Sequence, residues 1–447
     1  MNIRGLILAC VLILPAAALL AVGPRERHEV PADRVVVRYW EKWTGVEGQA
    51  IRQLVDRFNA ADGRRLGIWV EYNSISNIEQ RLLIATAGGD PPDLAGLVDS
   101  RVAQYADQDA LLPLDDLVRE HGVNLSHFKP IWVELGRYQD RLYALPSTPF
   151  TIALYYNRAL FRDAGLDPDR PPRTTAELNA YAQKLTKYGP DGRIVQLGFT
   201  VSNAMLGWWP WVWTNFFDGR LWDGRRFTLD TPAGRAAAEW IRDLRESVGR
   251  KQCLDFEAAA GPIESAQNPF LSCRLAMVFQ GPWMSNWIRT YAPELDYAVA
   301  PFPSATAERR NAFASEDVFV IPRGARRPHE AMTFLAWMQR QENLEELCRL
   351  HGKVSPFREP RPAFFDDHPN PFVRVFDELA ASPDAFGFPR MPMWAQVETE
   401  MIVALGSLLR GDRTPAQTVE RTQARVDAIV QEYERMAARR RGEGGAQ

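Results

Sequence analysis

Strands and helices alternate at the start of this chain, and the alternation limits the folds that it can adopt. Apolar, partly β-branched runs at 34–39, 66–72 and 93–98 are typical of short buried strands. Between them, residues 46–59 and 78–87 carry apolar side chains at helical spacing. A β-α-β-α-β order predicts a largely parallel sheet with crossover helices. We therefore expect an α/β fold.

A second unit follows in the middle of the chain. Thr174 and Glu177 form a capping-box signature, which predicts a helix reaching Lys187. Thr231 followed by Pro232 predicts another helix start, because proline suits the first helical position. A chain of 447 residues also exceeds one ordinary core, so we expect two lobes. Further strands are expected at 273–280, 297–301 and 317–321, and closing helices at 391–409 and 414–436.

The N-terminus predicts export from the cytoplasm. Arg4 precedes an uncharged and mostly apolar stretch over residues 5–23. This pattern is typical of a cleaved signal peptide, and its length also suits an uncleaved membrane anchor. Residues 1–23 are therefore expected to be one or the other. The charged residues 24–33 are expected to tether this segment to the folded body.

The cysteines point to a disulfide and not to a metal. Cys253 and Cys273 flank a loop containing proline and glycine, and they could form a bridge in an oxidising compartment. The sequence has no CxxC and no His/Cys cluster with zinc spacing, so we expect no metal and no cofactor. The net charge of −3 gives no reason to expect a nucleic-acid partner.

Tryptophans gather in irregular segments. The chain has 14 of them, and many lie beside glycine or proline and not on a periodic helix face. A tryptophan presents a large flat apolar surface, which suits the C–H face of a sugar ring. The alternative for each single tryptophan is a place in the core. The candidates for ligand contact are Trp43, Trp209, Trp211, Trp283 and Trp394.

Several segments together resemble a known family. YWEKWTG, GGDPPDLAGL, CRLAMVFQGPW and DVFVIPRG occur in this order. The set is similar to the family 1 extracellular solute-binding proteins of ABC importers, and the resemblance runs from about residue 35 to residue 430. It implies a two-lobed periplasmic-binding-protein fold of type II, with mixed, largely parallel sheets and lobes that hinge shut on a ligand.

The resemblance also implies boundaries. Lobe one would comprise residues 34–148 and 316–378, and lobe two residues 152–312 and 385–447. The chain would cross between the lobes near 147–151, 312–316 and 379–384.

Ligand contacts are carried over by the same resemblance. The segment after the first strand holds Glu41, Lys42 and Trp43. Carboxylates and Arg offer paired acceptors or donors to sugar hydroxyls, although Asp99 also suits a helix N-cap. Members that bind maltose hold a carboxylate where this chain has Phe150, which departs from a maltose-like pattern. The full candidate set is Glu41, Trp43, Asp99, Thr148, Phe150, Trp209, Trp211, Trp283, Arg390 and Trp394.

The function that these expectations imply is capture of a sugar or oligosaccharide outside the cytoplasm and its delivery to an ABC transporter permease, by a protein that is a monomer. One alternative ligand is glycerol phosphate or another phosphorylated polyol. A secreted glycosidase is a second alternative, with Glu41 and Glu316 as its two carboxylates. A third is a sensor subunit that reports its ligand to a membrane receptor.

Overall fold

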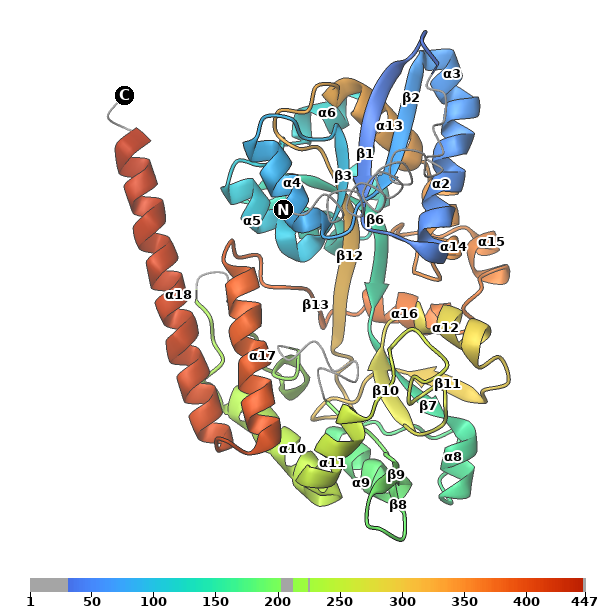
Figure 1. The fold of residues 1–447 in the computed structure, drawn as a ribbon, viewed down its shortest axis with the longest axis vertical. Helices are drawn as coiled ribbons and strands as arrows, with labels where there is room; N and C mark the ends of the chain where they lie inside the picture. Colours follow the sequence, from blue (N-terminus) through green and yellow to red (C-terminus); the bar gives the residue numbers. More distant parts are fainter. Residues whose placement is uncertain (1–30, 202–211, 224–225, 445–447) are drawn as a thin grey trace, which may run out of the picture.

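Two groups of strands and helices, one above the other in Figure 1, form the part of the protein that the structure describes. This computed structural model describes residues 31–201, 212–223 and 226–444. The predicted signal peptide or anchor and nearly all of the predicted tether lie outside these ranges. Among the helices within them, none is long and apolar enough to cross a membrane.

The upper group is built on a mixed six-stranded sheet. The first three strands pair in parallel, as the alternating pattern predicts. The longest strand of the sheet pairs antiparallel with two other strands and parallel with a third. The strands are β1 (Val35–Glu41), β2 (Ile68–Ser74), β3 (Leu94–Val98), β6 (Ala144–Thr151), β12 (Ala312–Val320) and β13 (Ala385–Phe386).

Helices cover both faces of this sheet. Successive side chains of β12 point to opposite faces. Phe319 therefore joins the core on one face, while Val318 and Val320 join the core on the other. The covering helices include α2 (Gly45–Ala60), α4 (Ile78–Ala87), α5 (Val102–Asp107), α13 (Pro328–Met338) and α14 (Gln341–Leu350).

The second strand starts later than predicted. Residue 66 belongs to a short helix, α3 (Asp62–Leu66), and Gly67 follows in the left-handed conformation with φ of 69°. Glycine adopts this conformation without a steric cost. It therefore ends the helix, and the strand begins at Ile68.

The lower group holds a smaller, antiparallel sheet. Its strands are β7 (Ala153–Asn157), β10 (Met277–Gln280) and β11 (Tyr297–Ala300), in the order β10-β7-β11. The expectation of largely parallel pairing therefore holds for β1, β2 and β3 but not here. Strand β10 begins after the predicted residue 273, because the chain turns at Cys273, where φ is 58°.

Long helices flank the smaller sheet, and their starts follow the predicted caps. The Glu177 N–H donates to Thr174 Oγ1 at 3.1 Å, and the Gly234 N–H donates to Thr231 Oγ1 at 3.1 Å. The first helix ends at Leu185, because Lys187 belongs to a short strand. These helices are α9 (Thr175–Leu185), α10 (Pro232–Val248), α17 (Trp394–Arg410) and α18 (Pro415–Gly444).

Shorter elements connect the parts described above. They are α6 (Asp115–Glu120), α7 (Pro130–Leu135), α8 (Arg158–Asp163), α11 (Arg250–Ala258), α12 (Met284–Tyr291), α15 (Pro362–Asp366), α16 (Val373–Ala380), β4 (Arg137–Tyr138), β5 (Arg141–Leu142), β8 (Lys187–Tyr188) and β9 (Ile194–Gln196).

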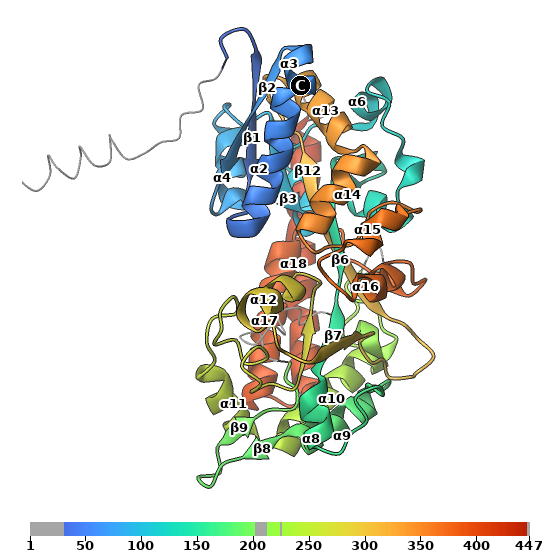
Figure 2. The same cartoon turned by 90° about the vertical axis from the view of Figure 1, so that its right-hand side faces the viewer.

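Strands β6 and β12 connect the two groups, as Figures 1 and 2 show from two sides. They pair antiparallel along most of their lengths, and every residue of both is buried. β6 continues almost directly into β7 of the smaller sheet. The predicted crossings at 147–151 and 312–316 fall on these two strands. The lobe boundaries placed on either side of them stay a prediction.

Two polar contacts also join α17 and α18 to the upper group. Arg101 Nη2 lies 3.2 Å from Glu398 Oε2 on α17. The Tyr433 hydroxyl on α18 donates to Asp107 Oδ1 at 2.5 Å. Helices α17 and α18 therefore contact the upper group through residues that belong to neither crossing strand.

The predicted disulfide is wrong. Cys253 and Cys273 are free thiols in the structure. Cys253 is buried in an apolar core with Phe256, and Cys273 is exposed, with its sulfur 3.4 Å from Asn157 Nδ2. The two thiols thus have different surroundings, and flanking one loop was not enough to pair them.

Candidate functional site

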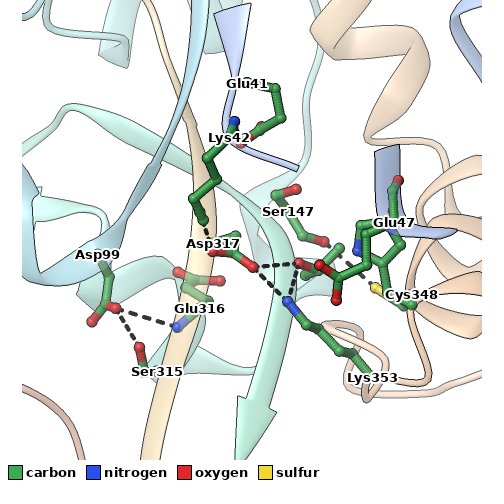
Figure 3. A network of polar contacts seen from close by, with 12 residues as sticks. Glu41, Lys42, Glu47, Asp99, Ser147, Ser315, Glu316, Asp317, Cys348 and Lys353 are labelled. Atoms are coloured by element: carbon green, nitrogen blue, oxygen red, sulfur yellow. Dashed lines mark hydrogen bonds and ion pairs between the residues drawn. The ribbon is translucent and has the colours of Figure 1, made fainter. Parts of the chain in front are cut away.

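A network of charged side chains lies where β1 ends beside the crossing strands (Figure 3). At its centre is Asp317 on β12. Its Oδ1 accepts from Lys42 Nζ, and its Oδ2 accepts from Lys353 Nζ at 2.5 Å and from Thr148 Oγ1 at 2.9 Å. Burial raises the pKa of Asp317, but the ammonium groups of Lys353 and Lys42 outweigh it and hold that pKa well below its usual range. Asp317 is therefore ionised at neutral pH.

Aromatic rings surround the ammonium group of Lys353. Its Nζ lies 5.8 Å from the ring centroid of Trp43, 5.6 Å from that of Phe150 and 5.9 Å from that of Trp283. Phe150 and Trp283 also meet edge to face, with centroids 4.8 Å apart. Trp43 follows β1, Phe150 lies on crossing strand β6, and Trp283 comes just before α12 in the lower group. The rings therefore bring three separate parts of the fold to one place.

Glu41 ends β1 as a buried carboxyl group. Its Oε2 accepts from the Tyr39 hydroxyl at 2.9 Å, and its Oε1 accepts from the Lys42 N–H at 2.8 Å. The carboxyl group lies against Gly96 of β3, where an added Cβ would stand 1.7 Å from Oε2. Burial raises the pKa of Glu41 to about 7, although the ammonium group of Lys42 opposes this shift.

Two further carboxyl groups lie beside the network. Asp99 Oδ1 accepts from Ser315 Oγ at 2.6 Å and from the Glu316 N–H at 3.3 Å. Its carboxyl group is thus tied to β12, and burial raises its pKa to about 7. Glu316 is fully buried, and neither of its carboxyl oxygens has a hydrogen-bond partner among the described residues. Burial and the carboxylate of Asp99 raise the pKa of Glu316 well above its usual range.

The remaining predicted residues lie elsewhere. Trp394 is fully buried in the lower core, where its ring packs 5.8 Å from that of Phe388. Arg390 points to Glu134, with Nη1 at 3.0 Å from the backbone oxygen and 3.1 Å from Oε2. Trp209 and Trp211 lie outside the described residues. The described network thus includes neither Trp394 nor Arg390.

Sequence reasoning missed Lys353 and placed Asp317 only at the start of a predicted strand. Lys353 lies in a loop after α14 that matches no binding motif, and it is 312 positions from Glu41. A local pattern therefore could not place it at the site. The pairing of β6 with β12 brings Thr148 opposite Asp317, which only the folded topology reveals.

The raised pKa of Glu41 predicts a pH effect on stability. Below pH 7 the folded protein holds this proton, whereas an unfolded glutamate releases it near pH 4.3. Raising the pH between these values therefore lowers the free energy of unfolding. Between pH 5 and pH 8, the free energy of unfolding of Glu41→Gln should rise by on the order of 1–3 kcal/mol relative to that of the wild type. Urea unfolding at the two pH values measures this difference. If the free energies of unfolding of Glu41→Gln and the wild type differed equally at both pH values, Glu41 would not be a buried, protonated group.

Two α/β groups joined by crossing strands, with aromatic and polar groups at the crossing, form the architecture of a two-lobed binding protein. Residues 42–345 match the family described as bacterial extracellular solute-binding protein, and the chain belongs to that family.

Relatives within this family differ in the ligands that their names state. The sn-glycerol-3-phosphate-binding periplasmic protein UgpB of Escherichia coli O6:K15:H31 is 23% identical over 89% of this chain and 93% of its own. A mannotriose-bound structure of CpMnBP1 is 26% identical, with a TM-score of 0.76, over 88% of this chain and 99% of its own. The structure of UgpB from Mycobacterium tuberculosis with glycerophosphocholine is 22% identical, with a TM-score of 0.73, over 89% and 99%.

Proposed function

We propose that the protein captures a sugar or oligosaccharide between its two lobes, outside the cytoplasm, and delivers it to the permease of an ABC importer. The observation that carries the proposal is the group of Trp43, Phe150 and Trp283 around one point of the crossing. Aromatic faces suit the apolar faces of sugar rings. The carboxyl groups of Glu41 and Asp99 lie in the same part of the fold and suit hydroxyl groups.

One of the three reported relatives supports the same ligand class. CpMnBP1, whose structure holds mannotriose, shares 26% identity and nearly the whole fold with this chain. In this proposal the lobes hinge about β6 and β12, with lobe one over 34–148 and 316–378 and lobe two over 152–312 and 385–447. The protein acts as a monomer, and an N-terminal signal directs its export.

Binding without turnover is part of the proposal. A glycosidase needs two carboxyl groups that face the same scissile bond. Glu41 instead accepts hydrogen bonds from Tyr39 and from the backbone, and it lies against Gly96. Glu316 lies between two other acidic residues, Asp99 and Asp317. These surroundings favour carboxyl groups held for binding over an acid and nucleophile pair.

The proposal is tested by thermal unfolding in the presence of mannotriose, maltotriose and free monosaccharides. A ligand at a hundred times its dissociation constant should stabilise the protein by about 2.7 kcal/mol. Chromatography of the recovered ligand should show the same sugar, uncleaved. Cleavage would favour the glycosidase, and the lack of any shift with a broad panel of neutral glycans would contradict a sugar ligand.

A further inference from the structure

A cavity of about 910 Å³ has walls from both groups, and it lies apart from the network around Lys353. The upper group contributes the end of α7 and strand β4, and the lower group contributes Trp222, the loop before α17 and residues 430–434 of α18. Figure 1 shows α18 running beside both groups. Ligand pockets commonly have volumes of about 300–1,000 Å³. Arg390, which the sequence predicted as a sugar contact, belongs to this lining.

The lining combines a buried apolar part with half-buried aromatic rings. Met391 and Met393 are 1% and 8% exposed. The three rings are those of Tyr138, Trp222 and Tyr433, each of them partly exposed. A partly exposed ring keeps some of its flat surface available to the C–H face of a sugar. The cavity therefore offers the apolar contacts that a sugar ring needs.

The two tyrosine rings are fixed at their polar ends. The hydroxyl groups of Tyr138 and Tyr433 both donate to Asp107 Oδ1, at 3.1 and 2.5 Å. The Tyr138 hydroxyl also accepts from Gln139 Nε2 at 3.1 Å. One ring belongs to the upper group and the other to α18, so Asp107 joins them across the cavity wall. Rings that are held in place before binding lose little freedom when a ligand arrives.

The polar side chains of the described lining are planar. Apart from the aromatic residues, each ends in a carboxylate, a guanidinium or an amide, as in Glu134, Arg137, Gln139, Asp140, Arg390 and Glu434. Such groups offer paired acceptors or donors to neighbouring hydroxyl groups. Glu134 Oε2 lies 3.1 Å from Arg390 Nη1, and Glu134 Oε1 lies 3.7 Å from Arg137 Nε. Because both guanidinium groups are already paired, the described lining suits a neutral ligand better than a phosphate.

We propose that this cavity is a second binding site, which takes a neutral sugar or short oligosaccharide. The inference goes beyond the proposed function, which needs only one ligand for each protein molecule. The two sites use the same chemistry, aromatic faces with planar polar groups, but they share no residue. The second site draws its rings from Tyr138, Trp222 and Tyr433, and the first from Trp43, Phe150 and Trp283.

The test counts the sugars bound to one protein molecule, by equilibrium dialysis against mannotriose and against maltotriose. The wild type should bind two equivalents at saturation. Trp222→Ala should weaken one of them roughly tenfold or more, because the change removes one stacking face. Trp283→Ala should weaken the other. Thermal unfolding without sugar shows whether each variant is folded.

A second variant and a matched control make the result specific. Val430 lies on α18 and lines the cavity, so Val430→Trp fills the site without changing the segment around Trp222. It should also reduce binding to one equivalent. Trp69 is a half-buried ring on β2 that belongs to neither site. Trp69→Ala should therefore keep both equivalents.

The outcomes separate this inference from the proposed function. One equivalent in the wild type, lost in Trp283→Ala but kept in Trp222→Ala and Val430→Trp, would overturn the second site and leave the proposed function in place. One equivalent lost in Val430→Trp but kept in Trp283→Ala would support the cavity and count against the cluster around Lys353. Two equivalents kept in both cavity variants would overturn the inference, and no binding of either sugar would contradict both proposals.

Discussion

Trp283→Ala should weaken sugar binding by about 1–3 kcal/mol while leaving the melting temperature of the ligand-free protein almost unchanged. The magnitude follows from the loss of one stacking face, by analogy with bases stacked on aromatic side chains. Trp283 is partly exposed, and its ring packs over Gly281 and against Phe150. Under the proposed function its removal takes away a ligand contact, while the ring lies only at the edge of the lower core. Calorimetry gives the affinity, and thermal unfolding gives the stability.

Trp394→Ala is the matched control. Trp394 also follows a proline-rich segment, but it is fully buried in the lower core. Its truncation should cost about 3–5 kcal/mol of stability, as large-to-small core substitutions do. If Trp283→Ala lowered the melting temperature as much as Trp394→Ala and bound the sugar normally, Trp283 would be a core residue and the site would lose its aromatic anchor.

Lys353→Met should destabilise the folded protein by about 3–5 kcal/mol. The change removes the buried partner of Asp317 and leaves its carboxylate with Lys42, whose side chain is 29% exposed. Removing one partner of a buried ion pair leaves the charge of the other partner poorly compensated. Methionine keeps most of the length and the apolar body of the side chain, so the loss reports the charge. Urea unfolding at pH 7 measures the free energy.

Lys251→Met provides the comparison on the surface. Lys251 pairs with Asp255 on α11, and both side chains are mostly exposed. Pairs of this kind contribute about 0–1 kcal/mol. Similar losses in the two variants would show that Lys353 acts through its apolar contacts and not through its charge.

Local patterns predicted the longer helices of this protein, whereas short ones such as α6, α7 and α12 were not predicted. The caps at Thr174 and Thr231 depend on residues three positions apart, so a short stretch of sequence contains the whole interaction. Apolar spacing alone predicted α4, which spans the predicted residues 78–87. Strand β12 was predicted only from residue 317, whereas it begins at Ala312. Its first residues are held by pairing with β13 and β6, which are distant in sequence.

The site was predictable only in part, for a related reason. Glu41 and Trp43 lie in one short segment, and the sequence around them was recognisable. Trp283 and Trp394 looked alike in sequence, since burial depends on neighbours from other elements. Lys353 carried no local signal, because its role comes from rings and a carboxylate on four other segments.

The contacts of α17 and α18 with the upper group bear on how long a captured ligand stays bound. In the proposed hinge motion, opening of the lobes would separate Arg101 from Glu398 and Tyr433 from Asp107. These contacts therefore add to the activation barrier for release, even though none of the four residues belongs to the aromatic cluster around Lys353. The proposed hinge would thereby place residence time and ligand selectivity on different residues, so that substitutions could change one and leave the other intact.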